Sequence, residues 1–144
     1  MDFGPIYIDH IGIAAHNLDD SSDFWRLIGL VQGEHDETVE DQGVTTRFFS
    51  TGKMSSTMPV AKVELLEPTG TDTPIGKFLS KRGPGVQQVC FSVGDLSGLL
   101  NHLIKNGVRL IDETPRQGAG GHMIAFVHPS STGGVLVELS QRQD

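Results

Sequence analysis

The sequence predicts an α+β fold made of two similar β-α-β-β-β modules in tandem. The main observation is an internal repeat: residues 9–15 (DHIGIAA) align without a gap on residues 87–93 (QQVCFSV), and residues 61–66 (AKVELL) match residues 135–140 (VLVELS). Apolar and polar residues also alternate in these segments, as they do along half-buried strands. A repeat of roughly 75 residues is longer than the periods of solenoid proteins. We therefore expect two modules related by a pseudo-two-fold axis.

Each module is expected to contribute four strands and one helix. Strands are predicted over residues 6–15, 30–34, 44–50 and 60–66, and again over residues 86–93, 108–112, 122–128 and 134–140. The first helix has Asn17 or Asp19 as its N-cap and ends at Gly29, whereas the second is capped by Asp95 and ends at Gly107. We expect one domain over residues 1–144, with repeats at about 6–67 and 86–141. The connector holds a short helix near residues 74–81, and the eight strands form one curved sheet around a metal site.

Bulk composition excludes several classes of function. The chain has 144 residues, with 11 basic and 18 acidic side chains and a formal charge of −7, and no basic stripe, so we expect no nucleic-acid partner. No segment reaches the roughly 18–20 apolar residues of a membrane span. The single cysteine, Cys90, excludes an internal disulfide and fits a reducing compartment. The patterned fold begins by Ile6, which leaves no room for a signal peptide. We expect a soluble, cytoplasmic protein.

Four polar side chains occupy equivalent places in the two repeats. Alternation puts His10 on a strand face with small residues, and Gln88 takes the same place in the second repeat. Glu64 and Glu138 each lie within a Val-Glu-Leu segment. A lone histidine is more often an ordinary core or surface residue, but an unpaired buried carboxylate is costly, and two at equivalent positions are unusual. We expect the four to converge beside a cavity and to bind a divalent ion such as Co, Mn, Ni or Zn.

Six segments carry a resemblance to a known family. They are residues 9–14 (DHIGIA), 40–44 (EDQGV), 63–68 (VELLEP), 72–79 (DTPIGKFL), 126–129 (FVHP) and 133–139 (GGVLVEL). With these segments the chain resembles, over almost its whole length, the methylmalonyl-CoA epimerases of the vicinal oxygen chelate superfamily. The resemblance implies the vicinal oxygen chelate fold and a homodimer. It also implies a metal held by His10, Glu64, Gln88 and Glu138, and interconversion of (2R)- and (2S)-methylmalonyl-CoA through an enolate.

Two positions depart from the family's pattern. Family members usually have His where this chain has Gln88, although glyoxalase I-like members use one Gln, one His and two Glu. Some epimerases also place a catalytic Glu where this chain has Thr46, and a threonine hydroxyl is not a base near neutral pH. We expect Glu138 to be one base, and Glu64 or a bound water to replace the missing carboxylate at Thr46.

Residues that would hold an acyl-CoA are less strongly indicated. Backbone N–H groups of the glycine-rich loop at residues 118–121, with Gly120 and Gly121, are expected to approach the substrate carboxylate together with Thr46. Lys77, with Lys81 and Arg82, is expected to meet the CoA phosphates. The plainer interpretations are turn glycines and solvated lysines.

Three other functions stay open at this point. A glyoxalase-type isomerase or lyase is favoured by the Gln-containing set, and an epimerase-like enzyme could act on another acyl-CoA. A non-catalytic small-molecule binder of the same fold would be expected to lack the two carboxylates. An extradiol dioxygenase would need two His and one carboxylate, and only His10 matches.

Overall fold

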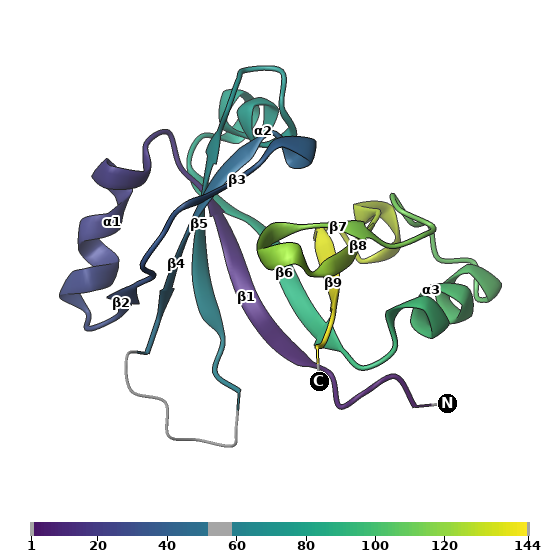
Figure 1. Cartoon of the computed structure of the whole chain (residues 1–144). Coiled ribbons are helices and arrows are strands. Elements are labelled where there is room, and N and C mark those ends of the chain that lie inside the picture. Colours follow the sequence, from purple (N-terminus) through teal and green to yellow (C-terminus); the bar gives the residue numbers. More distant parts are fainter. Residues whose placement is uncertain (1, 52–58, 144) are drawn as a thin grey trace. The chain divides into compact units, whose positions relative to one another are not determined.

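Nine strands and three α-helices form the described part of the chain, residues 2–51 and 59–143 of this computed structural model (Figure 1). The elements are β1 (Tyr7–Ala14), α1 (Leu18–Leu27), β2 (Val31–Gln32), β3 (Glu37–Val39), β4 (Val44–Ser50), β5 (Lys62–Pro68), α2 (Pro74–Arg82), β6 (Gly85–Val93), α3 (Leu96–Lys105), β7 (Arg116–Gln117), β8 (Met123–Val127) and β9 (Val137–Gln141). Most of the loop expected between β4 and β5, residues 52–58, lies outside the described residues. The chain divides into an N-terminal module, His10–Gln87, and a C-terminal module, Met1–Asp9 with Gln88–Asp144.

The N-terminal module is a mixed sheet with helices on both faces. β5 pairs in parallel with β1 and antiparallel with β4, and β4 also pairs with β2 and β3. Helix α1 packs on one face through a cluster of Leu18, Phe49 and Leu65. Helix α2 packs on the other face near one end of the strands, where Ile75 and Leu79 meet Ala14, Val44 and Leu66 (Figure 1). The end of that face near Ala14 is therefore filled by α2 and is not part of the expected cavity.

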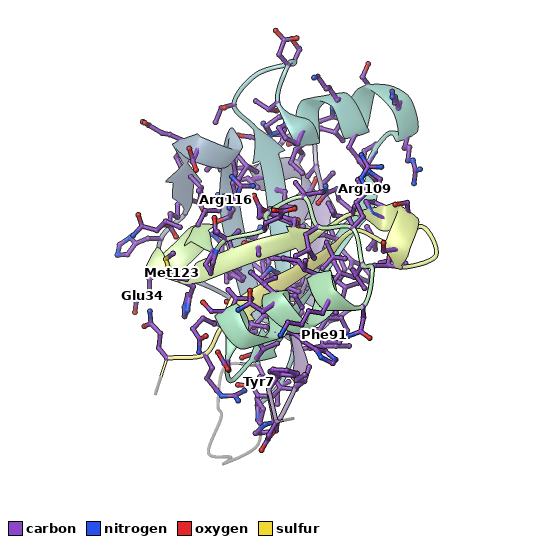
Figure 2. The ribbon with its side chains drawn as sticks, turned by 90° about the vertical axis from the view of Figure 1, so that its right-hand side faces the viewer. Tyr7, Glu34, Phe91, Arg109, Arg116 and Met123 are labelled. Atoms are coloured by element: carbon purple, nitrogen blue, oxygen red, sulfur yellow. The ribbon has the colours of Figure 1, made fainter. Side chains whose placement is uncertain are left out.

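The C-terminal module repeats this strand order with one covering helix. β9 pairs in parallel with β6 and antiparallel with β8, and β7 is the edge strand beside β8. Its core lies under α3 and combines Leu96, Leu99 and Leu100 with residues of β6, β8 and β9. Phe91, labelled in Figure 2, packs against this cluster.

Hydrogen bonds and strand register confirm the duplication seen in the sequence. Glu64 is paired with Gly12 on one side and Phe48 on the other, and Glu138 is paired with Cys90 and Phe126 in the same arrangement. The first amide of each helix is also bonded alike. Leu18 N–H donates to Glu67 Oε1 at 3.1 Å, and Leu96 N–H donates to Gln141 Oε1 at 2.8 Å. Both acceptors lie three residues after the repeated glutamate, so the modules match in detail.

Caps and strands follow the sequence expectation with two corrections. Asn17, rather than Asp19, caps α1, and Asp95 caps α3, each accepting a backbone N–H at 3.0 Å. The strand expected at residues 108–112 is reduced to a single bridge between Leu110 and Val127 of β8, because the next two amides, of Ile111 and Asp112, both donate to the Phe126 carbonyl and the regular ladder does not continue. Two short strands, β3 and β7, were expected to be loop, since their polar sequences carry no apolar alternation.

Candidate active site

The N-terminal module brings His10 and Glu64 together. His10 Nε2 lies 3.2 Å from Glu64 Oε1, and the two side chains are 9% and 4% exposed. Register explains the contact, because Glu64 lies opposite Gly12, two residues after His10 on the same face of the parallel strand pair. The ring of Phe48 meets the His10 imidazole edge-on at 5.4 Å, which fixes its orientation.

The C-terminal module brings Gln88 and Glu138 together in the same way. Gln88 Nε2 donates to Glu138 Oε1 at 2.9 Å, and both residues are buried, with 6% and 5% of their surface exposed. A buried carboxylate loses solvation that is worth several kcal/mol, which a neutral amide donor replaces only in part. The structure therefore forms two buried pairs, and each pair holds one carboxylate away from water.

The donor atoms fit a divalent ion. Two ligand atoms that each lie about 2.1 Å from one metal ion are about 3.0–3.4 Å apart at tetrahedral or octahedral angles. The separation of 3.2 Å between His10 Nε2 and Glu64 Oε1 falls in this range. Gln88 would have to turn its amide to offer its carbonyl oxygen, because its nitrogen faces Glu138 here. Nitrogen and oxygen donors without a thiolate suit Co, Mn, Ni or Zn.

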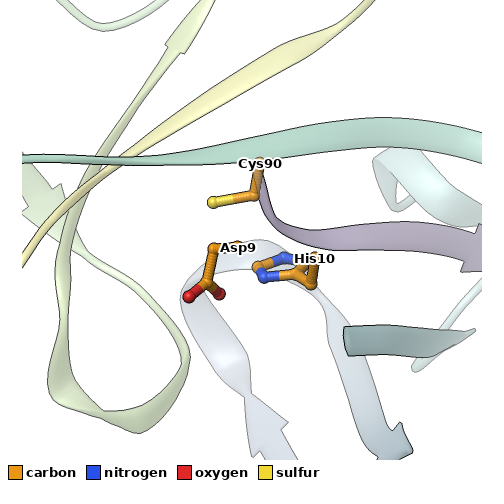
Figure 3. Close-up of side chains that lie close together, drawn as sticks. All are labelled: Asp9, His10 and Cys90. Atoms are coloured by element: carbon orange, nitrogen blue, oxygen red, sulfur yellow. The ribbon is translucent and has the colours of Figure 1, made fainter. Parts of the chain in front are cut away.

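Cys90 lies beside the second pair and was not expected to be functional. It is fully buried, it is registered with Glu138, and its sulfur lies within 4.8 Å of a carboxylate oxygen of Asp9 (Figure 3). Figure 3 also draws His10, the residue that follows Asp9 along β1. In the sequence, Cys90 indicates only a reducing compartment and no role in the site.

The remaining expected site residues have mixed surroundings. Thr46 is 1% exposed and its hydroxyl donates to the Glu37 carbonyl oxygen at 3.4 Å. Gly120 and Gly121 adopt φ angles of 68° and 74°, which glycine accepts without strain. Within this loop the amide N–H groups of Gly118 and Gly121 donate to His122 and Gly118 carbonyls, so those two donors are already engaged. Lys77 is exposed on α2.

Two charged residues on the short strands were missed because the strands themselves were missed. Glu37 is registered with Thr46 on β4, and Arg116 is registered with Ile124 on β8. Arg116 lies over the Phe126 ring at 5.6 Å and its Nε is 3.1 Å from Asp112 Oδ1. Figure 2 labels Arg116 and, on the neighbouring β8, Met123. The two residues occupy equivalent positions in the duplicated fold, and their side chains carry opposite charges.

A partly buried ion pair fixes the chain that leads into β3. Arg47 Nε and Nη2 donate to both carboxylate oxygens of Asp36 at 2.8 and 2.7 Å, and its Nη1 donates to Asp19 and Ser22, each at 2.9 Å. These hydrogen bonds hold the pKa of the Asp36 carboxyl below its usual value and raise the pKa of Arg47. Arg47 is 10% exposed, so the pair is screened less than a surface pair.

The chain shares both sequence and fold with characterised proteins. Residues 9–126 match the glyoxalase/bleomycin resistance protein/dioxygenase superfamily. An uncharacterized protein of Bacillus subtilis is 42% identical over 93% of this chain and 91% of its own length. The mitochondrial methylmalonyl-CoA epimerase of Dictyostelium discoideum is 37% identical, over 94% of this chain and 78% of its length.

A solved structure gives the same result. A variant of Streptomyces coelicolor methylmalonyl-CoA epimerase in complex with 2-nitronate-propionyl-CoA superposes with a TM-score of 0.85, at 38% identity, over 94% of this chain and 93% of that one. This likeness and the duplicated βαβββ modules confirm the expected fold class. The chain therefore belongs to the glyoxalase/bleomycin resistance protein/dioxygenase superfamily, the vicinal oxygen chelate proteins, and within it to the family of the methylmalonyl-CoA epimerases.

Proposed function

We propose that this protein is a divalent-metal-dependent epimerase that interconverts (2R)- and (2S)-methylmalonyl-CoA by proton transfer at the α-carbon. The observation that carries this proposal is the pair of buried carboxylates at equivalent positions, each in contact with a second donor. Membership of a family whose relatives are named methylmalonyl-CoA epimerases supports the choice of substrate.

The metal ligands in this proposal are His10, Glu64, Gln88 and Glu138, which share one ion. Co, Mn, Ni and Zn all suit this set of oxygen and nitrogen donors. When bound, the ion would act as a Lewis acid that stabilises negative charge on the thioester oxygen. Burial of the four side chains excludes water, which strengthens that stabilisation.

Proton transfer is the task of the chain's own carboxylates. Inversion passes through a planar enolate, so a proton must leave one face of the α-carbon and arrive at the other. Glu138 serves as one of the two groups in this proposal. Glu64 is the partner that the sequence alone indicates for the opposite face.

Substrate-binding groups complete the proposal. Thr46 and the loop glycines Gly120 and Gly121 lie near the substrate carboxylate, and the exposed Lys77 meets the CoA phosphates. No helix in residues 2–51 and 59–143 is long and apolar enough to span a membrane. We further propose that the two modules form one domain and that the protein acts as a cytoplasmic homodimer.

Glu138→Gln tests the central assignment. The variant keeps the shape of the side chain but removes its charge, so we expect inversion of methylmalonyl-CoA by the metal-loaded enzyme to fall by about 10²–10⁴-fold. Glu113→Gln, the same change at an exposed position of the C-terminal module, should leave the rate unchanged. Inversion at the wild-type rate in Glu138→Gln would contradict the assignment.

A glyoxalase-type isomerase is the second candidate, because the donor set contains one Gln, one His and two Glu. It differs from the first in its substrate, a hemithioacetal of glutathione in place of an acyl-CoA. Turnover of methylglyoxal with glutathione, without turnover of methylmalonyl-CoA, would favour this candidate.

A further inference from the structure

We propose that Glu37 on β3 is the second proton-transfer residue, the group that acts on the opposite face of the α-carbon from Glu138. This inference rests on the proposed epimerase function and names a residue for it. The chemistry of inversion calls for such a group. Inversion requires two groups that exchange protons, and the hydroxyl of Thr46 cannot be one of them near neutral pH.

Strand register places Glu37 on the face of the sheet that carries Glu64. In the antiparallel β3–β4 pair, Glu37 lies directly opposite Thr46, and Val39 lies opposite Val44. Directly opposed residues project to the same face, with Cβ atoms about 4.5–5.5 Å apart. Val39 packs against the cluster formed by Val44 and Leu66, so that face is the one covered by α2 at its end. Glu37, two residues from Val39, shares it.

The neighbours of Glu37 confirm this orientation independently. Asp36 is bound to Arg47, which lies next to Thr46 along β4 and reaches Ser22 of α1 on the opposite face. Thr38 is 2.9 Å from Thr45 through their hydroxyl oxygens, also on the α1 side. Since successive side chains of a strand alternate, Glu37 between them points the other way. The Asp36–Arg47 pair therefore anchors the backbone from which Glu37 projects.

The other titratable groups on that face are less suited to the task. Register assigns His10, Lys62 and Glu64 to it as well. His10 and Glu64 contact each other in a buried pair, and Glu64 acting as the base in addition to binding the ion, as proposed for Glu138, is the alternative that the Glu37→Gln test below decides. Lys62 is registered with His10, at the end of the strands away from Thr46. Glu37 is an exposed residue, whereas Glu64 is buried.

The inversion balances in protons and electrons without any further reactant. One carboxylate takes the α-proton, so the C–H bond breaks and its electron pair enters the enolate. The protonated carboxyl on the other face then gives up its proton, and the electron pair of the enolate forms the new C–H bond. The two carboxyl groups have exchanged protonation states, and exchange with solvent resets them. No group is oxidised or reduced.

Glu37→Gln is the decisive variant, since it keeps the shape of the side chain at an exposed position. We expect the inversion rate to fall by about 10²–10⁴-fold, while the affinity for Co²⁺ measured by titration calorimetry stays within twofold of the wild type. In heavy water, only the enantiomer whose α-proton faces Glu138 should still incorporate deuterium, and it should do so without inverting. Glu34→Gln, an exposed control three residues earlier, should behave as the wild type.

A relocated carboxylate provides the rescue experiment. Because Thr46 is the registered partner of Glu37, the double variant Glu37→Gln with Thr46→Glu should regain at least tenfold of the lost inversion rate. Glu37→Asp should retain part of the activity. If the double variant fails to fold, because Thr46 is buried, deuterium incorporation in Glu37→Gln alone decides.

The outcomes separate the two proposals. If the wild type neither inverts nor exchanges methylmalonyl-CoA with any metal, the proposed function fails and Glu37 fails with it. Wild-type inversion that persists in Glu37→Gln overturns the role of Glu37 alone. Loss of Co²⁺ binding in Glu37→Gln would also overturn that role, because it would mean that Glu37 supports the structure of the site instead. Loss of inversion in Lys62→Met, with Glu37→Gln unaffected, would assign the task to Lys62.

Discussion

At the scale of single residues, Gln88 is the most informative about which metal ion the protein prefers. It occupies the place that a histidine usually takes in the family, and its amide nitrogen donates to Glu138. An amide oxygen is a harder and weaker donor than an imidazole nitrogen. The exchange shifts the expected preference toward harder ions such as Mn and away from Zn.

Gln88→His should reverse that preference. An added imidazole gives the set two nitrogen and two carboxylate donors, so affinity for Zn²⁺ and Co²⁺ should rise by about tenfold or more, equivalent to about 1.4 kcal/mol. Competition titration with a chromogenic chelator measures it. The control is Gln87→His, where strand alternation directs the new ring to the opposite face. Unchanged Zn²⁺ affinity in Gln88→His would argue against Gln88 as a ligand.

The four candidate ligands could be selected from the sequence because the repeat places them at equivalent positions of alternating strands, where position alone decides the face. The contacts of His10 with Glu64 and of Gln88 with Glu138 come from the structure and were not predicted. Cys90 beside Asp9 was not predictable, since one small apolar residue in a strand carries no chemical signal. Glu37 was missed for a different reason: its strand has only three residues and no apolar period.

At the scale of elements, β3 depends on an ion pair rather than on burial. Its three residues are mostly exposed, and both carboxylate oxygens of Asp36, just before it, accept hydrogen bonds from one edge of the Arg47 guanidinium. Such short polar strands escape sequence analysis, because charge pairing between distant residues leaves no local pattern. The same holds for β7, whose Arg116 is placed by Asp112. The longer strands and all three helices were predictable from alternation, caps and terminal glycines.

Asp36→Asn should therefore destabilise the fold measurably. It leaves Arg47 largely buried with weaker partners, and the loss of charged hydrogen bonds should cost about 1–3 kcal/mol. The estimate stays low because Asp36 is itself 33% exposed and Asp19 still binds Arg47. Thermal unfolding should show a melting temperature lower by roughly 3–9 °C. Asp23→Asn, which breaks an exposed pair with Arg26, should cost about 0.2–1 kcal/mol at most.

The pH dependence of this difference follows from the lowered pKa of Asp36. A carboxyl whose pKa is depressed by folding contributes stability that is fully present above its unfolded pKa, about 3.9. The contribution is lost as the pH falls through the folded pKa. The gap between wild type and Asp36→Asn should thus be constant above about pH 5 and narrow below pH 4. A gap that is equal at pH 3 and pH 7 would contradict the role of the charge.

At the scale of the whole molecule, duplication connects sequence to proposed chemistry. Each module supplies one buried glutamate flanked by a phenylalanine, one nitrogen-bearing side chain in contact with it, and one charged residue on a short outer strand. The two modules carry different side chains at two of these equivalent positions: His10 corresponds to Gln88, and Glu37 corresponds to Arg116. An inversion needs two groups acting from opposite faces of one carbon. The proposals assign these two tasks to Glu138 of the C-terminal module and Glu37 of the N-terminal module, two carboxylates that do not occupy equivalent positions.

The measurement that tests this account most directly is deuterium incorporation into each enantiomer of methylmalonyl-CoA in heavy water. It compares apo protein with protein loaded with Co, Mn, Ni or Zn. We expect metal-dependent exchange at the α-carbon of both enantiomers, with inversion accompanying exchange, because a base acts on each face. Absence of exchange with every metal, while the protein is folded and binds the ion, would contradict the epimerase function.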